Sequence, residues 1–350
     1  MKNYLKPLGL SLAAVVTFLL LWIGGSKLLY NKAVDTTIEK IRTTQSEEAA
    51  IETKKRIESG DPSSQPNSLP SPGYVWKTAK LLMEDSGKVM QDKREFKKKM
   101  ADTNKKLIKA GKKPITYTGR PSFLDQILTS LENILWGVLL AMAISIPIGI
   151  LTGLSKNFRM ASNWFIQIFK PISPVVWFLL VQMIVNTVMT DPDADNAFVI
   201  TFISVGLCAM WATLVNTAVG VSSVDENYLN VAKVLRLSPL KKITKVVLPA
   251  AVPLIFTGLR ITVSVSWMVL IAVEWLSQSP GLGGFVREEF QNGSSSSNAK
   301  IMVAMFVIGI IGFLLDKIMA TIQGMVSFDD RQKVSPLAVV RNLFTKKQAA

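Results

Sequence analysis

The chain contains 350 residues, of which 49% are hydrophobic, and its mean hydropathy is positive at +0.32. It carries 40 basic and 25 acidic residues, which gives a formal charge of +15, with no histidine and one cysteine. The absence of histidine excludes histidine-based triads and general bases and argues against a zinc site. Cys208 has no partner for an internal disulfide, and its apolar neighbours indicate a packing role. We therefore predict no catalytic residue, no cofactor and no metal.

Long apolar segments indicate a membrane protein and argue against a nucleic-acid partner, which the net charge alone would allow. A spanning helix needs about 20 mostly apolar residues. Six segments meet this requirement, at approximately 8–29, 127–154, 162–189, 197–221, 250–277 and 300–325. The excess of lysine and arginine then reads as charge that flanks the membrane and faces its lipid. The sequence predicts an all-α membrane protein with six spans.

The first apolar segment also resembles a signal peptide, because Lys2 and Lys6 precede its apolar core. No clear cleavage site with small residues follows, since the segment ends in Gly24-Gly25-Ser26-Lys27. We therefore favour a retained N-terminal anchor over a cleaved leader.

Short loops with lysine and arginine are expected on the cytoplasmic side of a membrane. Such residues lie in the loop after the second span, in the loop after the fourth span and in the C-terminal tail: Lys156, Arg159, Lys233, Arg236, Lys241, Lys242, Lys245, Arg331, Lys333, Arg341, Lys346 and Lys347. The loop at 190–196 instead holds Asp191, Asp193 and Asp195 and no basic residue. This pattern places both termini in the cytoplasm and residues 31–122 outside.

Residues 31–122 form a long, lysine-rich insert between the first two spans. Residues 35–59 read as a polar helix, residues 60–73 as a linker of proline, serine and glycine, and residues 92–113 are dominated by lysine. The simpler interpretation is a solvated and partly helical hairpin. The alternative is a surface that docks an external partner.

The loop at 222–249 has the strongest local pattern in the chain. Ser223 with Glu226 fits a capping box, and an apolar stripe follows at helical spacing: Tyr228, Val231, Ala232 and Leu235. Ser238 followed by Pro239 predicts the start of a second helix. An amphipathic projection of this kind fits a groove on a soluble partner. The alternative is a helix that lies on anionic lipid.

This loop resembles the coupling loop of ABC-importer permeases, whose pattern is Glu-Ala-Ala, three residues, Gly and then a hydrophobic-Leu-Pro ending. Asn230-Val231-Ala232 and Leu248-Pro249 carry the resemblance, while Asn230 replaces the glutamate and Arg236 replaces the glycine. The resemblance covers about 220 residues, mostly within 122–325. Four further segments carry it: Pro147-Ile148-Gly149, Pro171-Ile172-Ser173-Pro174, Phe256-Thr257-Gly258-Leu259-Arg260-Ile261 and Pro280-Gly281-Leu282-Gly283. The sequence at 230–238 and 255–260 is most similar to that of the nitrate/nitrite branch, whose relatives transport cyanate and bicarbonate.

The resemblance implies a type I, MetI-like permease fold in the bacterial inner membrane, with import of nitrate, nitrite or a related oxyanion. Sulfonate or taurine, and bicarbonate, are the alternative substrates. The implied partners are ABC ATPase subunits, an extracytoplasmic substrate-binding protein and a second permease copy or paralogue. The loop residues expected to contact the ATPase are Tyr228, Asn230, Val231, Ala232, Leu235, Arg236 and Ser238. The chain itself has no nucleotide-binding signature, because Gly293–Lys300 lacks the second glycine before lysine.

Charged residues inside predicted spans are costly unless they are paired or hydrated. Glu132, Arg260, Glu274 and Asp316 lie in such positions. Arg260 and Glu274 are about 21 Å apart along one helix, so they cannot pair directly. Snorkelling of the side chains to the membrane interface, or structural pairing, is the simpler interpretation for all four, while Arg260 and Glu274 are candidates for the translocation path.

The sequence thus divides into an N-terminal anchor at 1–30, an extracytoplasmic insert at 31–122, a permease core at 123–326 with the coupling loop at 222–249, and a basic cytoplasmic tail at 327–350. Two other classes of function compete with the transport permease. A secondary carrier would need its own coupling-ion site and more spans, and a membrane scaffold or sensor would use the insert to bind a ligand.

Overall fold

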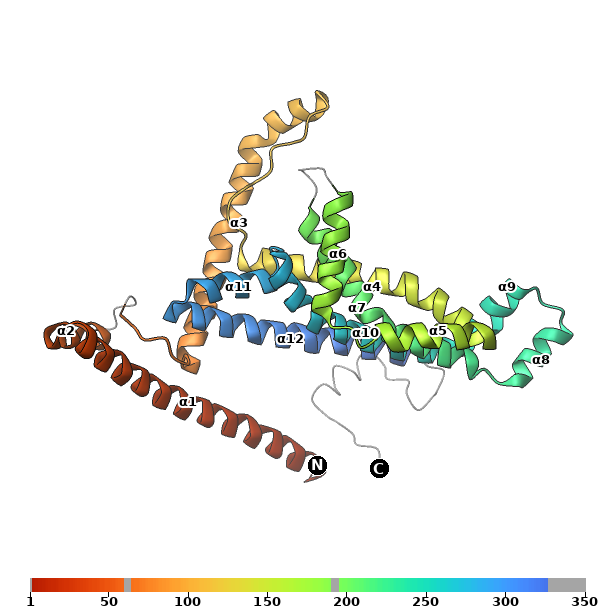
Figure 1. The fold of residues 1–350 in the computed structure, drawn as a ribbon, viewed down its shortest axis with the longest axis horizontal. Coiled ribbons are helices and arrows are strands. Elements are labelled where there is room, and N and C mark those ends of the chain that lie inside the picture. Colours follow the sequence, from red (N-terminus) through yellow and green to blue (C-terminus); the bar gives the residue numbers. More distant parts are fainter. Residues whose placement is uncertain (1, 60–63, 190–194, 327–350) are drawn as a thin grey trace. The chain divides into compact units, whose positions relative to one another are not determined.

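The computed structural model describes residues 2–59, 64–189 and 195–326, and within these ranges all regular secondary structure is helical (Figure 1). Five helices are long and apolar enough to cross a membrane: α1 (Lys2–Thr44), α4 (Phe123–Leu154), α7 (Asn196–Ser222), α10 (Leu248–Ser277) and α12 (Ser295–Val326). The count rises to six if the bent pair α5 (Lys156–Phe169) and α6 (Pro174–Val188) forms one span. The all-α prediction is confirmed, and the predicted number of spans agrees with the upper count.

The span predicted at 162–189 is broken into two helices. Helices α5 and α6 meet at an angle of 99°. Pro171 and Pro174 explain the break, because proline has no N–H for the helical ladder and disfavours helical geometry in the residue before it. Ser173 accordingly has extended backbone angles and occupies the N-cap position of α6 without a side-chain hydrogen bond, and Pro174 follows at the start of the helix.

The N-terminal part also differs in its boundaries. The helix expected at 35–59 is divided, because α1 continues to Thr44 and α2 (Glu47–Glu58) begins after Ser46, whose hydroxyl accepts a hydrogen bond from the Ala49 N–H. Helix α3 (Pro72–Lys109) then continues through most of the lysine-rich stretch. The divisions at residues 30 and 122 concern the membrane and remain predictions. The aspartates Asp191 and Asp193 and the tail at 327–350 lie outside the described residues.

The chain forms two compact units. The first comprises Met1–Leu128 and Pro280–Ile308, including α11 (Leu282–Asn292), and the second comprises Thr129–Ser279 and Gly309–Ala350. In the first unit, the Trp22 indole donates to the Pro70 carbonyl at 3.0 Å and lies 5.5 Å from the Phe306 ring. These contacts attach α1 to the segment before α3 and to the N-terminal half of α12.

The second unit is organised around α7, which packs against α6 and α10 and against α4. Glycines permit close approach of these helices: a Cβ atom on Gly149 would lie 2.6 Å from the Thr217 Cβ, and one on Gly258 would lie 2.9 Å from the Thr213 Cα. Small residues are the usual means by which membrane helices approach closely. The resulting core contains Ala141, Ile166, Trp177, Met210, Trp211 and Leu214.

We predict that Gly258→Val destabilises the second unit, because its side chain would collide with the backbone of α7. Overpacking of this kind costs about 1–3 kcal/mol. The control is Gly309→Val on α12, where an added Cβ atom meets nothing within 4 Å. Thermal unfolding in detergent should show a lower midpoint for Gly258→Val alone, and equal midpoints for the two variants would contradict this packing.

Candidate functional site

The loop after α7 begins with a short helix, α8 (Glu226–Val234). Its N-cap is Asp225, whose carboxylate accepts a hydrogen bond from the Asn227 N–H at 2.8 Å. The predicted capping box at Ser223 is therefore wrong. Ser223 instead ends α7, and its hydroxyl donates to the Gly220 carbonyl. Both side chains are common N-caps, so the sequence alone allowed either start.

One face of α8 is apolar and open. Tyr228, Val231 and Leu235 are 61%, 56% and 64% exposed, as expected for a docking stripe. Ala232 is the exception at 2% exposed, so its predicted place on the docking surface is wrong. It lies buried on the inner side of α8, which contacts the helical segment that follows.

Two further exposed side chains enlarge this apolar surface, and the sequence pattern did not identify them. Val234 is 82% exposed and Leu240 is 75% exposed. Val234 falls outside the stripe defined by helical spacing, and Leu240 belongs to the next helix. We use the name loop surface for Tyr228, Val231, Val234, Leu235 and Leu240. Exposed apolar side chains gathered in this way are typical of an interaction site.

Arg236 ends α8 in a left-handed conformation, with φ of 48°. The Arg236 N–H donates to the Lys233 carbonyl, and the Leu237 N–H donates to the Ala232 carbonyl, which together form a Schellman motif. Glycine is the usual residue at this position, so the backbone geometry explains why the permease pattern has glycine where this chain has Arg236. Asn230, Arg236 and Ser238 are all exposed.

The second helix of the loop is continuous with the span that follows. Ser238 and Pro239 begin α9 (Pro239–Lys242) as predicted, although the Ser238 hydroxyl makes no capping hydrogen bond. A π-helical segment, η1 (Ile243–Val247), then leads directly into α10. Val247 is buried with Val221, Ala251, Ile255 and Leu259, so the base of the loop is fixed in the core.

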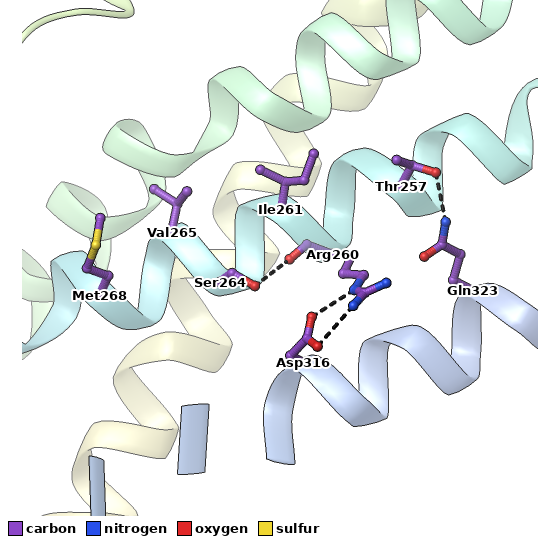
Figure 2. A pocket seen from close by; sticks show the side chains of 8 residues that line it. All are labelled: Thr257, Arg260, Ile261, Ser264, Val265, Met268, Asp316 and Gln323. Carbon is purple, nitrogen blue, oxygen red and sulfur yellow. Dashed lines mark hydrogen bonds and ion pairs between the residues drawn. The ribbon is translucent and has the colours of Figure 1, made fainter. Parts of the chain in front are cut away.

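Arg260 lines a pocket of about 440 Å³ between α10 and α12 (Figure 2). Its Nε lies 2.7 Å from one carboxylate oxygen of Asp316, and its second terminal nitrogen lies 2.9 Å from the other. The remaining lining residues are Thr257, Ile261, Ser264, Val265, Met268 and Gln323. Because the side chains of Arg260 and Asp316 are 40% and 33% exposed, the pair remains accessible from the pocket.

The pair joins the two helices and neutralises its own charge. A bidentate guanidinium–carboxylate pair is a strong and directional contact. A second contact beside it links the same helices, because the Gln323 amide donates to the Thr257 hydroxyl at 2.8 Å (Figure 2). The sequence predicted a paired Arg260, and it placed Asp316 on the last span without identifying it as the partner.

Glu274 is fully buried, so the expectation that it faces a path is not supported by its position in this chain. Its carboxylate accepts hydrogen bonds from the Ser130 hydroxyl at 2.8 Å and from the Asn133 amide at 2.9 Å. Asn133 also donates to the Ser279 hydroxyl at 3.3 Å. Glu274 therefore fixes α10 to α4 inside the second unit, and Arg260 is the candidate path residue that remains accessible.

Comparisons with known proteins give a consistent result. A sequence model described as "Binding-protein-dependent transport system inner membrane component" matches residues 145–328. The nitrate import permease protein NrtB of Synechococcus elongatus is 35% identical over 202 residues, which cover 58% of this chain and 69% of the relative. The bicarbonate transport system permease protein CmpB of the same organism is 37% identical over 199 residues, which cover 57% of this chain and 67% of the relative.

The fold has a counterpart among solved structures. The MetNI methionine ABC transporter, solved in inward-facing conformations, contains a chain that superposes with a TM-score of 0.51 at 13% identity. The superposition covers 58% of this chain and 95% of that chain. At this identity the likeness concerns the fold alone.

We predict that Arg260→Gln and Asp316→Asn each lower the thermal stability of the purified protein, because each leaves one member of the pair without its charged partner. The exchanged variant Arg260→Asp/Asp316→Arg should recover most of that stability. Thermal unfolding and transport are measured on the unmodified protein and on these three variants. The two measurements together distinguish a structural role of Arg260 from a role on the translocation path. Recovered stability without recovered transport would locate the required positive charge on α10, whereas recovery of both would leave only a structural role.

Proposed function

Because this chain belongs to the family of inner membrane components of binding-protein-dependent transport systems, we propose that it imports a small oxyanion of the nitrate type. It is a multi-pass membrane permease of an ABC importer. ATP hydrolysis in such an importer is carried out by separate ATPase subunits, and delivery of the substrate requires a substrate-binding partner. Permeases of this kind usually act as dimers, and we propose that a second copy or a paralogue completes the path.

The loop surface is the observation that supports coupling to an ATPase. Its five exposed apolar side chains lie on α8, at the C-cap of α8 and on α9. The inner residue of α8, Ala232, is buried, and Val247 fixes the base of the loop in the core. A rigid apolar projection is suited to a hydrophobic groove on a partner. We therefore propose that the loop at 222–249 inserts into a cleft of the ATPase subunit, with Asn230, Arg236 and Ser238 at its edge.

The proposed substrate is nitrate or nitrite, and bicarbonate is the main alternative. The relatives support both, because the nitrate permease and the bicarbonate permease have similar identity to this chain. These anions are small, and each carries one negative charge shared among oxygens that accept hydrogen bonds from arginine. Sulfonate or taurine would need room for an additional carbon group. A scaffold that does not transport would not account for the exposed apolar side chains of the loop surface.

Arg260 is the residue that we propose to lie on the translocation path. Its guanidinium is accessible in a pocket that Asp316 also lines. The neutral polar side chains of the pocket are Thr257, Ser264 and Gln323. An anion that enters the pocket would compete with Asp316 for the guanidinium. Such competition gives weak and reversible binding, which transport requires. Alternating access then follows from movement of the two permease subunits against each other.

Uptake of labelled nitrate into proteoliposomes that contain the complete transporter tests the substrate. We expect ATP-dependent uptake that excess unlabelled nitrite reduces and excess taurine does not. Bicarbonate is added as a third competitor. Inhibition by bicarbonate alone would transfer the proposal to that anion, and ATP-dependent uptake of none of these substrates would contradict the oxyanion assignment.

Val234→Glu tests the coupling surface. The substitution puts a carboxylate on a side chain that is 82% exposed, so folding and insertion should be retained while burial in the ATPase groove becomes unfavourable. We expect loss of ATPase co-purification and of transport. Lys241→Glu, on the same loop but outside the loop surface, is the control. Ala232→Glu would be uninformative, since its burial predicts a disrupted loop.

Cysteine labelling tests the proposed orientation, with both termini in the cytoplasm. In a Cys208→Ala background, a single cysteine at Ala101 in α3 should react with an impermeant reagent added to intact spheroplasts. A cysteine at Lys241 should react only after the membrane is opened. The reverse pattern would place the loop surface outside and would exclude contact with a cytoplasmic ATPase.

A further inference from the structure

The C-terminal part of α3 and the turn after it carry about half of the net charge of the chain. Residues 92–113 contain ten basic and three acidic residues, a net charge of +7 out of +15. This segment lies outside residues 145–328, which match the permease family. Its charge therefore needs an explanation that the permease core does not supply.

The segment is an ordered hairpin. After α3 ends, residues 111–122 return alongside it (Figure 1). The Asn104 side chain pairs with the backbone of Ile115 in both directions, donating to its carbonyl at 3.0 Å and accepting from its N–H at 2.8 Å. The rings of Phe96 and Tyr117 meet edge to face at 5.6 Å, and Lys93 forms an ion pair with Asp125 at 2.6 Å.

The two faces of α3 in this hairpin have opposite chemistry. At about 100° per residue, the apolar side chains Val89, Phe96, Met100 and Leu107 fall on one face. All four are buried or half-buried, and Phe96 contacts the returning segment. The opposite face carries Arg94, Lys98, Lys105 and Lys109, which are all exposed. We call this exposed set the basic face, and it extends for about 22 Å along the helix.

The positive charges of this hairpin are mostly uncompensated within the chain. Among the described residues of 92–113, seven lysines form no ion pair: Lys97, Lys98, Lys99, Lys105, Lys106, Lys109 and Lys112. Like charges at this density repel one another, and an acidic surface placed against them relieves the repulsion. A stripe of charge on a rigid arm also accelerates the encounter with an oppositely charged partner.

We propose that the basic face docks an acidic surface of the extracytoplasmic substrate-binding component. This inference rests on the proposed function and on its orientation, which places α3 outside. A protein fits better than a lipid surface, because an interfacial helix needs an open apolar face, whereas Val89, Phe96, Met100 and Leu107 are buried or half-buried. Binding through charge alone is reversible and salt-sensitive, as repeated delivery of substrate requires.

Binding of the transporter's own substrate-binding protein to the full-length permease complex tests the proposal. The complex is held in nanodiscs of neutral phosphatidylcholine, and affinity is measured at low and at high salt. Lys98→Glu/Lys105→Glu reverses two charges on the basic face. The control is Lys54→Glu/Lys55→Glu, which makes the same change in charge on two exposed residues of α2.

We expect Lys98→Glu/Lys105→Glu to weaken binding about tenfold or more at low salt, with little effect of the α2 control. High salt should weaken binding of the unmodified complex and remove the difference. Equal weakening by both variants, or by neither, would overturn the proposal. An effect that appears only in nanodiscs containing phosphatidylglycerol would identify anionic lipid as the partner and would also overturn it. If the unmodified complex binds no substrate-binding protein at any salt concentration, the proposed function itself fails.

Discussion

Helices α7 and α10 approach until their backbones are in contact, and the position of the candidate pocket depends on this approach. Gly258 removes the side chain that would separate them, and the Thr262 hydroxyl donates to the Ala209 carbonyl at 3.0 Å while it accepts from the Thr213 N–H at 3.2 Å. Residues 258 and 262 therefore share the face that meets α7. Arg260 lies about 200° around the helix from Gly258, so the same packing directs it away from α7 and toward Asp316 on α12. The packing of α10 against α7 on one face thus determines that Arg260, on the other face, meets Asp316.

The sequence predicted the long apolar helices well, because about 20 consecutive apolar residues have few alternatives to a membrane span. It did not predict the break within the span expected at 162–189. Hydropathy does not distinguish one helix from two when a break is itself apolar, and the pair of prolines at 171 and 174 carried the only signal. The same prolines belong to a segment that resembles the permease family, and their physical effect is to end one helix and begin another.

The candidate site was predictable in its location and less so in its contacts. Helical spacing placed Ala232 with Tyr228 and Val231 on one stripe, but spacing does not reveal which edge of a stripe another helix covers. Likewise, an intramembrane arginine implies an acidic partner, yet Asp316 is 56 residues from Arg260 and only the packing of α10 against α12 joins them. Glu274 is an acidic residue within a span whose carboxylate accepts hydrogen bonds from neutral side chains on α4. An acidic residue within a span therefore does not by itself indicate a translocation path.

The direct continuation of α9 through η1 into α10 has a mechanical consequence. No flexible connection separates the loop from Arg260, which lies 17 residues beyond Ile243, or about 26 Å along a continuous helical rod. A tilt imposed on the loop must therefore be absorbed within η1 or at Pro253, or appear at the far end as a displacement of the guanidinium. The π-helical turn is one irregular point in this rod, with wider hydrogen-bonded rings than the α-helix on either side, and Pro253 is another. The stiffness of η1 and of the helix around Pro253 would set the fraction of a movement of the loop that reaches Arg260.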